Sequence, residues 1–163
     1  MPGKKELYLR NIIFGVSDSL VSTVGLLSGI DATGATKQTI LMTGIVYAFV
    51  EAFSMAVGSF LSEESVEEYA AKRRVGNRNA VMAALVMFVS FMAASFVPIL
   101  PYIFFGLATA LWVSIALSIA TLFVLGLISA RYVKVRMTGH AIKMALLGGA
   151  AIAIGVVVGK FVK

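Results

Sequence analysis

Two acidic side chains, Asp18 and Glu51, each lie inside a long apolar stretch of the sequence. A carboxylate at the centre of a membrane helix costs about 2.5 to 3.5 kcal/mol on insertion scales, so an acid is unexpected there unless it has a function. Ionisable residues held at membrane depth usually bind or relay ions and protons. Asp18 and Glu51 are therefore our first candidates for function. The alternative for each is a structural hydrogen bond to a neighbouring helix.

Each acid shares a helix face with small or soft side chains. At helical spacing, Asp18 is aligned with Asn11, Ser22, Gly25 and Gly29, and Glu51 is aligned with Gly44, Tyr47, Met55, Gly58 and Ser62. The two glycines that follow Asp18 form a GxxxG pattern, which lets membrane helices approach closely. We therefore expect the face of Asp18 to contact protein rather than lipid, and a two-fold axis between copies is one arrangement that achieves this.

Met55 indicates the kind of ion that these acids would bind. At a rise of about 1.5 Å per residue, Asp18 lies about 10 Å and Met55 about 9 Å from one membrane surface, with Glu51 deeper at about 15 Å. We therefore expect Asp18 and Met55 to meet at one level. A carboxylate beside a thioether suits ferrous iron better than calcium or magnesium, which prefer oxygen ligands alone. The alternative for Met55 is ordinary packing or lipid contact.

Four further glutamates follow the second apolar stretch: Glu63, Glu64, Glu67 and Glu68. On a continuing helix they share one face, where they would concentrate divalent cations and bind them through oxygen. The alternative is a solvated charged segment, in which Glu68 pairs with Lys72 and the basic residues that follow balance the rest.

The composition is that of an integral membrane protein. The chain has 60% hydrophobic and 13% charged residues and a mean hydropathy of +0.95, whereas soluble domains are about half apolar and a quarter charged. The absence of cysteine excludes disulfides and thiolate metal sites, and the single histidine, His140, provides no pair for haem or zinc. We expect no enzymatic activity and no bound cofactor.

The apolar stretches predict an all-α chain that forms a single transmembrane domain over residues 1–163. We expect five spanning helices and two polar linkers: the spans are at about 11–30, 38–61, 79–98, 102–130 and 143–160, and the linkers are at 62–78 and 131–142. Between Asn79 and Ala130 there is no charged residue, and this run is too long to cross a bilayer once. We place its break between Pro98 and Tyr102, where two prolines disfavour helix.

The basic residues predict an orientation. With five spans, the N-terminus and both linkers lie on one side of the membrane, and of the fourteen Lys and Arg only Lys37, Lys160 and Lys163 lie on the other. The positive-inside rule then places the N-terminus in the cytoplasm and the C-terminus outside or in a lumen. The orientation therefore explains the net charge of +6, and we expect membrane lipid rather than nucleic acid as a partner. It does not distinguish the cell membrane from that of an organelle.

Three segments together resemble the vacuolar iron transporter family. They read RNIIFGVSDSLV from Arg10, EAFSMAVGSFLS from Glu51 and VPILPY from Val97, and a GLISAR segment before the glycine-rich last span fits as well. The resemblance implies a five-helix homodimer with the first spans at its centre. Such a protein moves ferrous iron and often manganese out of the cytoplasm, in some members against protons. It also implies that Asp18 and Met55 are metal positions and that Glu51 is a second ion or proton site.

The sequence departs from that family in two places. Many members have a glutamate directly after the glycine of the second motif, where this chain has Ser59, and Glu51 would have to supply that charge from deeper in the membrane. Well-known members also carry a longer cytoplasmic metal-binding segment than residues 62–78. Cytoplasmic metal capture would therefore depend on the four linker glutamates.

Two other functions remain open from the residues alone. A small proton-coupled exporter of organic cations would also use membrane carboxylates, with Tyr47, Phe49 and Trp112 lining a larger pocket. A non-transporting interaction module would use the GxxxG faces for assembly and pair its acids with a basic partner. Ion-dependent flux distinguishes both from a metal transporter.

Overall fold

The computed structural model describes residues 4–74, 76–133 and 137–161. Within these ranges the chain forms five α-helices and no strand: α1 (Lys4–Ala32), α2 (Lys37–Ala71), α3 (Arg78–Phe104), α4 (Leu107–Val133) and α5 (Met137–Phe161). Each helix is long and apolar enough to cross a membrane. The prediction of an all-α, multi-pass integral membrane protein is therefore confirmed.

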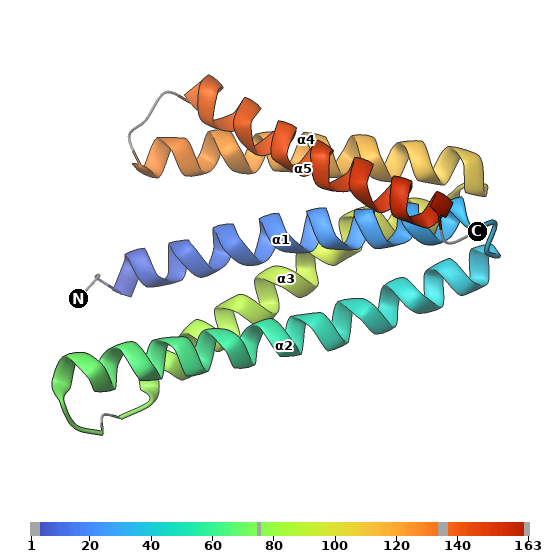
Figure 1. Cartoon of the computed structure of the whole chain (residues 1–163). Helices are drawn as coiled ribbons and strands as arrows, with labels where there is room; N and C mark the ends of the chain where they lie inside the picture. The colour runs from blue at the N-terminus through green and yellow to red at the C-terminus, as the bar shows by residue number, and fades with distance from the viewer. Residues whose placement is uncertain (1–3, 75, 134–136, 162–163) are drawn as a thin grey trace.

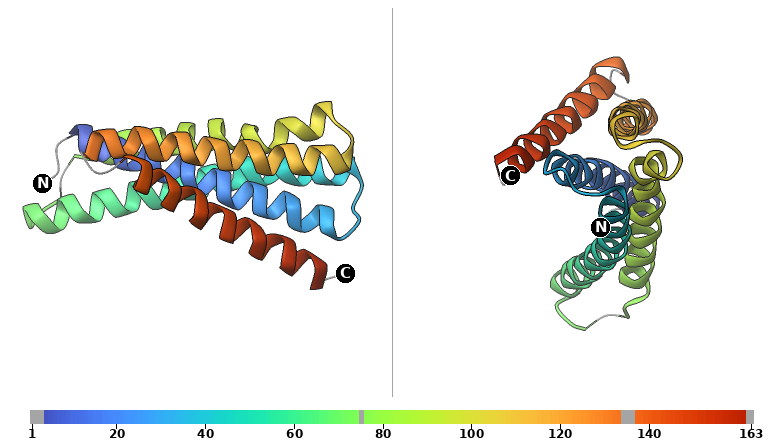
Figure 2. Two further views of the ribbon diagram at one scale, coloured as in Figure 1. Left: turned by 90° about the horizontal axis from the view of Figure 1, so that it is seen from above. Right: turned by 90° about the vertical axis from the view of Figure 1, so that its right-hand side faces the viewer.

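Helix α1 lies at the centre and packs against each of the other four helices. In Figure 1, α2 lies below α1, α3 crosses behind it, and α4 and α5 lie above. The end view in Figure 2 shows α2, α3, α4 and α5 in an arc around α1, which is open between α2 and α5. Every side chain on α1 therefore faces either a neighbouring helix or this open side.

The break in the long uncharged run does not lie at the prolines. Helix α3 continues through Pro98 and Pro101 and ends at Phe104, so the predicted break between Pro98 and Tyr102 is wrong. A proline inside a membrane helix is tolerated where neighbouring groups satisfy the backbone that it disturbs. The Ser114 hydroxyl of α4 donates to the Pro98 carbonyl at 2.8 Å, which ties α4 to α3 between the two prolines.

The end of α3 receives a cap from the start of α2. The Lys37 ammonium donates to the carbonyls of Ile103 and Phe105, at 3.2 and 3.0 Å. The last carbonyls of a helix have no partner within the helix, and a cation is favourable beside them. Thr36 caps the start of α2 by accepting the Thr39 N–H at 3.2 Å. These contacts hold the turns at this end of the bundle together.

Most of the predicted linker at residues 62–78 is helical, because α2 continues to Ala71. Its glutamates hold the turn into α3: the Asn77 amide donates to Glu64 and the Asn79 amide donates to Glu67, each at 2.7 Å. Of the second predicted linker, residues 134–136 lie outside the described residues, as does Lys163 at the C-terminus.

Four glycines bring the backbones of α1 and α5 into contact. A Cβ added at Gly155 would lie 2.5 Å from the Gly25 carbonyl oxygen, and one at Gly159 would overlap the backbone of Gly29. No side chain fits there unless the backbone moves. The GxxxG face of α1 therefore contacts protein, as predicted, but its partner is α5 of the same chain.

Candidate functional site

A cavity of about 850 Å³ lies between α1 and α2, on the half of the bundle that holds the N-terminus. Eleven residues line it: Arg10, Asn11, Ile13, Phe14, Ser17, Ser54, Met55, Gly58, Ser59, Ser62 and Met87. All except Met87, which belongs to α3, come from α1 and α2. The predicted face of α2 that carries Met55, Gly58 and Ser62 therefore faces this cavity.

The polar groups of the lining are hydroxyls and one amide, together with the thioethers of Met55 and Met87. None of the described lining residues carries a carboxylate, and the one charged group is the guanidinium of Arg10. Such a surface has both oxygen and sulfur donors for a borderline metal ion, but it has no negative charge of its own.

Two side-chain contacts join α1 to α2 at the end of the cavity nearest the N-terminus. The Arg10 guanidinium donates to Glu63 at 3.1 Å, and the Ser59 hydroxyl donates to the Asn11 amide oxygen at 2.7 Å. Asn11 is buried, and its amide nitrogen donates to the Leu7 carbonyl at 2.9 Å, so both ends of its amide are satisfied. These two contacts place polar groups at that end of the cavity.

The two membrane carboxylates lie just past the other end of the cavity. Asp18 follows the lining residue Phe14 by four positions and Glu51 precedes the lining residue Met55 by four, so each continues a lined helix face. Asp18 is half-buried and within electrostatic range of Glu51 across the two helices. The structure therefore brings together the two acids that the sequence singled out.

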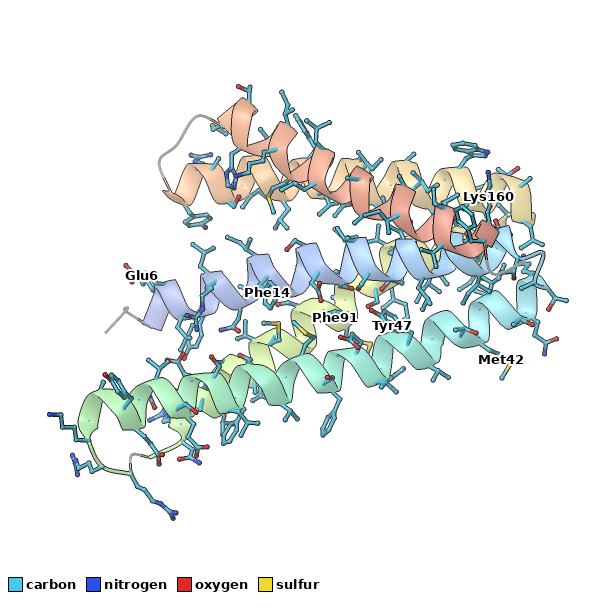
Figure 3. The ribbon with its side chains drawn as sticks, viewed as in Figure 1. Glu6, Phe14, Met42, Tyr47, Phe91 and Lys160 are labelled. Carbon is cyan, nitrogen blue, oxygen red and sulfur yellow. The ribbon has the colours of Figure 1, made fainter. Side chains whose placement is uncertain are left out.

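Tyr47 completes this level of the bundle. Its phenol contacts the Ser22 hydroxyl of α1 and lies within electrostatic range of both Asp18 and Glu51. Figure 3 shows Tyr47 and Phe14 in the region between α1 and α2. A phenol and a hydroxyl beside two carboxylates add neutral oxygen groups to the site.

A second hollow, of about 500 Å³, lies on the same pair of helices beyond the acids. It is lined by Leu26 of α1 and by Met42, Thr43, Val46, Tyr47 and Val50 of α2. Asp18 and Glu51 therefore lie between two hollows, one on each side. We call this surface the α1–α2 seam: it runs from Arg10 and Glu63 through the two acids to Leu26 and Met42.

The contacts along the seam also correct the expected level of Met55. Asn11 contacts Ser59 and Ser22 contacts Tyr47. This antiparallel register sets Asp18 level with Glu51, whereas Met55 lies about one turn nearer the N-terminal end. The depth estimate from the sequence assumed that both helices cross the membrane upright from the same surface.

The four linker glutamates do not assemble into one site. Glu63 binds Arg10, while Glu64 and Glu67 accept hydrogen bonds from Asn77 and Asn79. In the part of the chain that the structure describes, no three His, Cys, Asp or Glu side chains come together as a metal-ion site. Within a single chain, three of these glutamates therefore bind side chains of α1 or of the turn into α3.

Met87 is a lining residue that the sequence did not reveal. It is 2% exposed, and its sulfur would lie 3.1 Å from a Cβ added at Gly15, so the glycine makes room for it beside α1. A methionine in an apolar helix has no distinguishing signal. Phe49 and Trp112, proposed for an organic-cation pocket, are 56% and 70% exposed and do not line the cavity.

The chain matches the family model described as the VIT family over residues 9–78 and 66–160. The two matched segments extend from the start of α1 almost to the end of α5, so they include every residue of the α1–α2 seam.

Curated relatives come from plants and an archaeon. The chain is 32% identical over 107 residues to vacuolar iron transporter homolog 4 of Arabidopsis thaliana, covering 60% of this chain and 54% of that protein. It is 27% identical over 161 residues to vacuolar iron transporter homolog 1 of Oryza sativa subsp. japonica, covering 90% and 63%. An uncharacterized protein of Methanocaldococcus jannaschii is 26% identical, covering 89% and 84%. The chain therefore spans less than two thirds of the length of the two plant relatives.

Proposed function

This chain belongs to the VIT family, as its three motifs predicted, and on that premise we propose that it transports divalent transition-metal ions across the membrane through the α1–α2 seam. The observation that carries the proposal is the position of Asp18 and Glu51, which lie at one level between two hollows. Two plant relatives named as vacuolar iron transporter homologs support ferrous iron as the first ion to test.

The charge at the level of the acids explains how the site would work. Two carboxylates close together in a membrane are costly when both are ionised and no cation is bound between them, because each disfavours the charge of the other. A divalent cation or protons would neutralise them. Competition between metal and protons for Asp18 and Glu51 then couples the movement of one to the movement of the other, which is the basis of antiport.

The two methionines supply the preference among metals. Met55 and Met87 line the cavity that leads to the acids, so an ion approaching from the N-terminal end meets thioethers before it meets Asp18. Sulfur favours ferrous iron over magnesium and calcium, and manganese is the second ion, accepted mainly by the oxygen groups.

A second copy of the chain would complete the pathway. The arc of helices leaves α1 open between α2 and α5 (Figure 2), and both hollows lie along α1. In a homodimer joined through this open side, the acids of both copies would surround one central path. The basic N-terminal end would face the cytoplasm, with export as the direction of transport.

An organic-cation exporter is the second candidate, because a volume of about 850 Å³ lies within the range of small-molecule pockets. Of the aromatic residues proposed for such a site, only Tyr47 lies on the seam, and it borders the second hollow. This candidate predicts flux of an aromatic or quaternary cation without metal.

The test is ferrous iron flux into proteoliposomes, with a pH dye inside and manganese as the second ion. Replacing Asp18→Asn removes the charge but keeps the size. We expect flux to fall about tenfold or more, the scale on which losing a group at a metal site weakens it. The matched control is Asp31→Asn, the same change at the far end of α1, which lines neither hollow.

The outcomes separate the candidates. Loss of flux in Asp18→Asn with retention in Asp31→Asn supports a metal transporter that uses the seam. Equal flux in both variants contradicts the role of Asp18. Absence of metal flux in a folded wild-type protein contradicts the proposed function altogether.

A further inference from the structure

The ion pair at the N-terminal end of the cavity is strongly asymmetric. The Glu63 side chain is 10% exposed, whereas the side chain of its partner Arg10 is 61% exposed. Arg10 also lines the cavity, and Ser59, one turn before Glu63 on α2, lines it as well. A buried acid and a solvated base therefore meet at the N-terminal end of the cavity.

The two partners differ in what happens when they separate. A long guanidinium side chain can leave for water at little cost, because most of it is already solvated. The buried Glu63 carboxylate cannot, because an unpaired charge in a buried position is strongly unfavourable. When Arg10 moves away, another cation or a proton must therefore neutralise Glu63.

The polar groups that adjoin the ion pair along α1 and α2 are suitable ligands for such a cation. The amide oxygen of Asn11 and the hydroxyl of Ser59 lie 2.7 Å apart, on residues that adjoin the ion pair on both helices. Asn11 directly follows Arg10, and Ser59 precedes Glu63 by one helical turn. A carboxylate, an amide oxygen and a hydroxyl are oxygen ligands that a hydrated divalent cation accepts.

We propose that Glu63, Asn11 and Ser59 form the first binding site for the divalent ion, and that the Arg10 guanidinium is a tethered cation that occupies this site until the ion displaces it. The proposal rests on the proposed transport function and assigns the regulation of its pathway. Because Arg10 already balances one negative charge, a monovalent ion gains little by replacing it. A divalent ion gains more, so the exchange favours divalent ions.

The alternative is that the ion pair is only a structural clasp between α1 and α2. The two roles predict different changes in the apparent KM for ferrous iron. If Arg10 competes with the ion, then Arg10→Gln lowers the apparent KM for ferrous iron and Glu63→Gln raises it. If the pair is only a clasp, both variants remove the same contact and shift KM in the same direction.

The experiment measures the concentration dependence of ferrous iron flux in proteoliposomes for wild type, Arg10→Gln and Glu63→Gln. We expect KM to change about fivefold in opposite directions, the lower end of typical coupling between competing ligands, while kcat changes little. The matched control is Arg78→Gln, an exposed basic residue that does not line the cavity, and it should leave KM unchanged.

Equilibrium binding gives a readout that does not need transport. Titration of detergent-solubilised protein with manganese, followed by electron paramagnetic resonance of the free ion, should show tighter binding in Arg10→Gln and weaker binding in Glu63→Gln. Shifts of both variants in one direction, or no shift in either, would overturn the inference while leaving the transport function in place.

Folding of the variants is also informative. If Arg10→Gln does not fold, Arg10→Met, which keeps an unbranched apolar stem without the charge, takes its place. Failure of both to fold would show that Arg10 is a clasp and would overturn the inference. Absence of ferrous iron flux in the wild type is a different result, because it contradicts the proposed function itself.

Discussion

Helix α1 makes two opposite kinds of contact with one stripe of small and polar residues. Toward α5, Gly25 and Gly29 meet Gly155 and Gly159 with backbone against backbone, and a Cβ has no room. Toward α2, the helices are joined through side chains and leave hollows of about 850 and 500 Å³ between them. The α2 side of the larger hollow also carries small residues, namely Ser54, Gly58, Ser59 and Ser62. Small residues on both helices therefore do not by themselves produce close packing.

The difference also separates stability from function. The glycine contact holds α5 against α1, and the hollow of about 370 Å³ beside it is lined by glycines, apolar side chains and Thr33, with no carboxylate or thioether. The α1–α2 seam leaves space for an ion and is joined by a few polar contacts that can exchange. We expect substitutions in the first region to affect folding and substitutions in the second to affect transport.

The largest effect is expected from Gly155→Leu. The added side chain would overlap the Gly25 carbonyl, so α5 must move away from α1, and overpacking of this kind costs about 1 to 3 kcal/mol or more. Thermal unfolding in detergent measures this loss of stability. The control is Gly149→Leu on the same helix, where an added Cβ meets no atom within 4 Å. Equal stability of the two variants would contradict the distinction between the two regions.

A smaller effect is expected from Ser59→Ala in the α1–α2 seam. It leaves the buried Asn11 amide oxygen without its donor at 2.7 Å, which costs about 1 to 3 kcal/mol less any compensation by water in the cavity. The control is Ser65→Ala, whose hydroxyl bonds only to the Leu61 carbonyl of its own helix at 2.7 Å. A loss of stability as large as that of Gly155→Leu would show that the seam is a packing surface.

The smallest effect is expected from Met87→Leu, which keeps the volume and removes the sulfur. Stability should change by less than about 1.5 kcal/mol, because volume-conserving changes in a core are tolerated. The preference for ferrous iron over magnesium in competition flux should fall severalfold, since only Met55 remains as a thioether. The control is Met82→Leu on the same helix, which is 39% exposed. Unchanged selectivity would remove Met87 from the metal pathway.

Features of single helices were predictable, and features that depend on two helices were less so. The five apolar helices and the α2 face with Met55 and Ser62 follow from hydropathy and helical periodicity, and the structure agrees. The break at Pro98 was wrong because α3 continues through both prolines, and whether a proline ends a membrane helix depends on the helices packed around it. The level of Met55 was one turn off because register depends on how α1 and α2 pack.

The candidate site shows the same division. Asp18 and Glu51 were identifiable because charge in an apolar run is visible in the sequence, whereas Met87 was hidden among ordinary apolar residues. Glu63 was predicted with the other linker glutamates as part of a metal cluster, and the structure instead pairs it with Arg10, a residue 53 positions away.

The sequence by itself determined that this is a membrane protein with five apolar helices and two acids inside them, because transfer free energies and helical spacing act on each segment independently. Only the tertiary structure decided which neighbour each face of α1 meets. It set the glycines against α5 and left hollows on both sides of Asp18 and Glu51. The reason is that these contacts depend on the shapes of side chains from distant segments, which meet only when the helices pack.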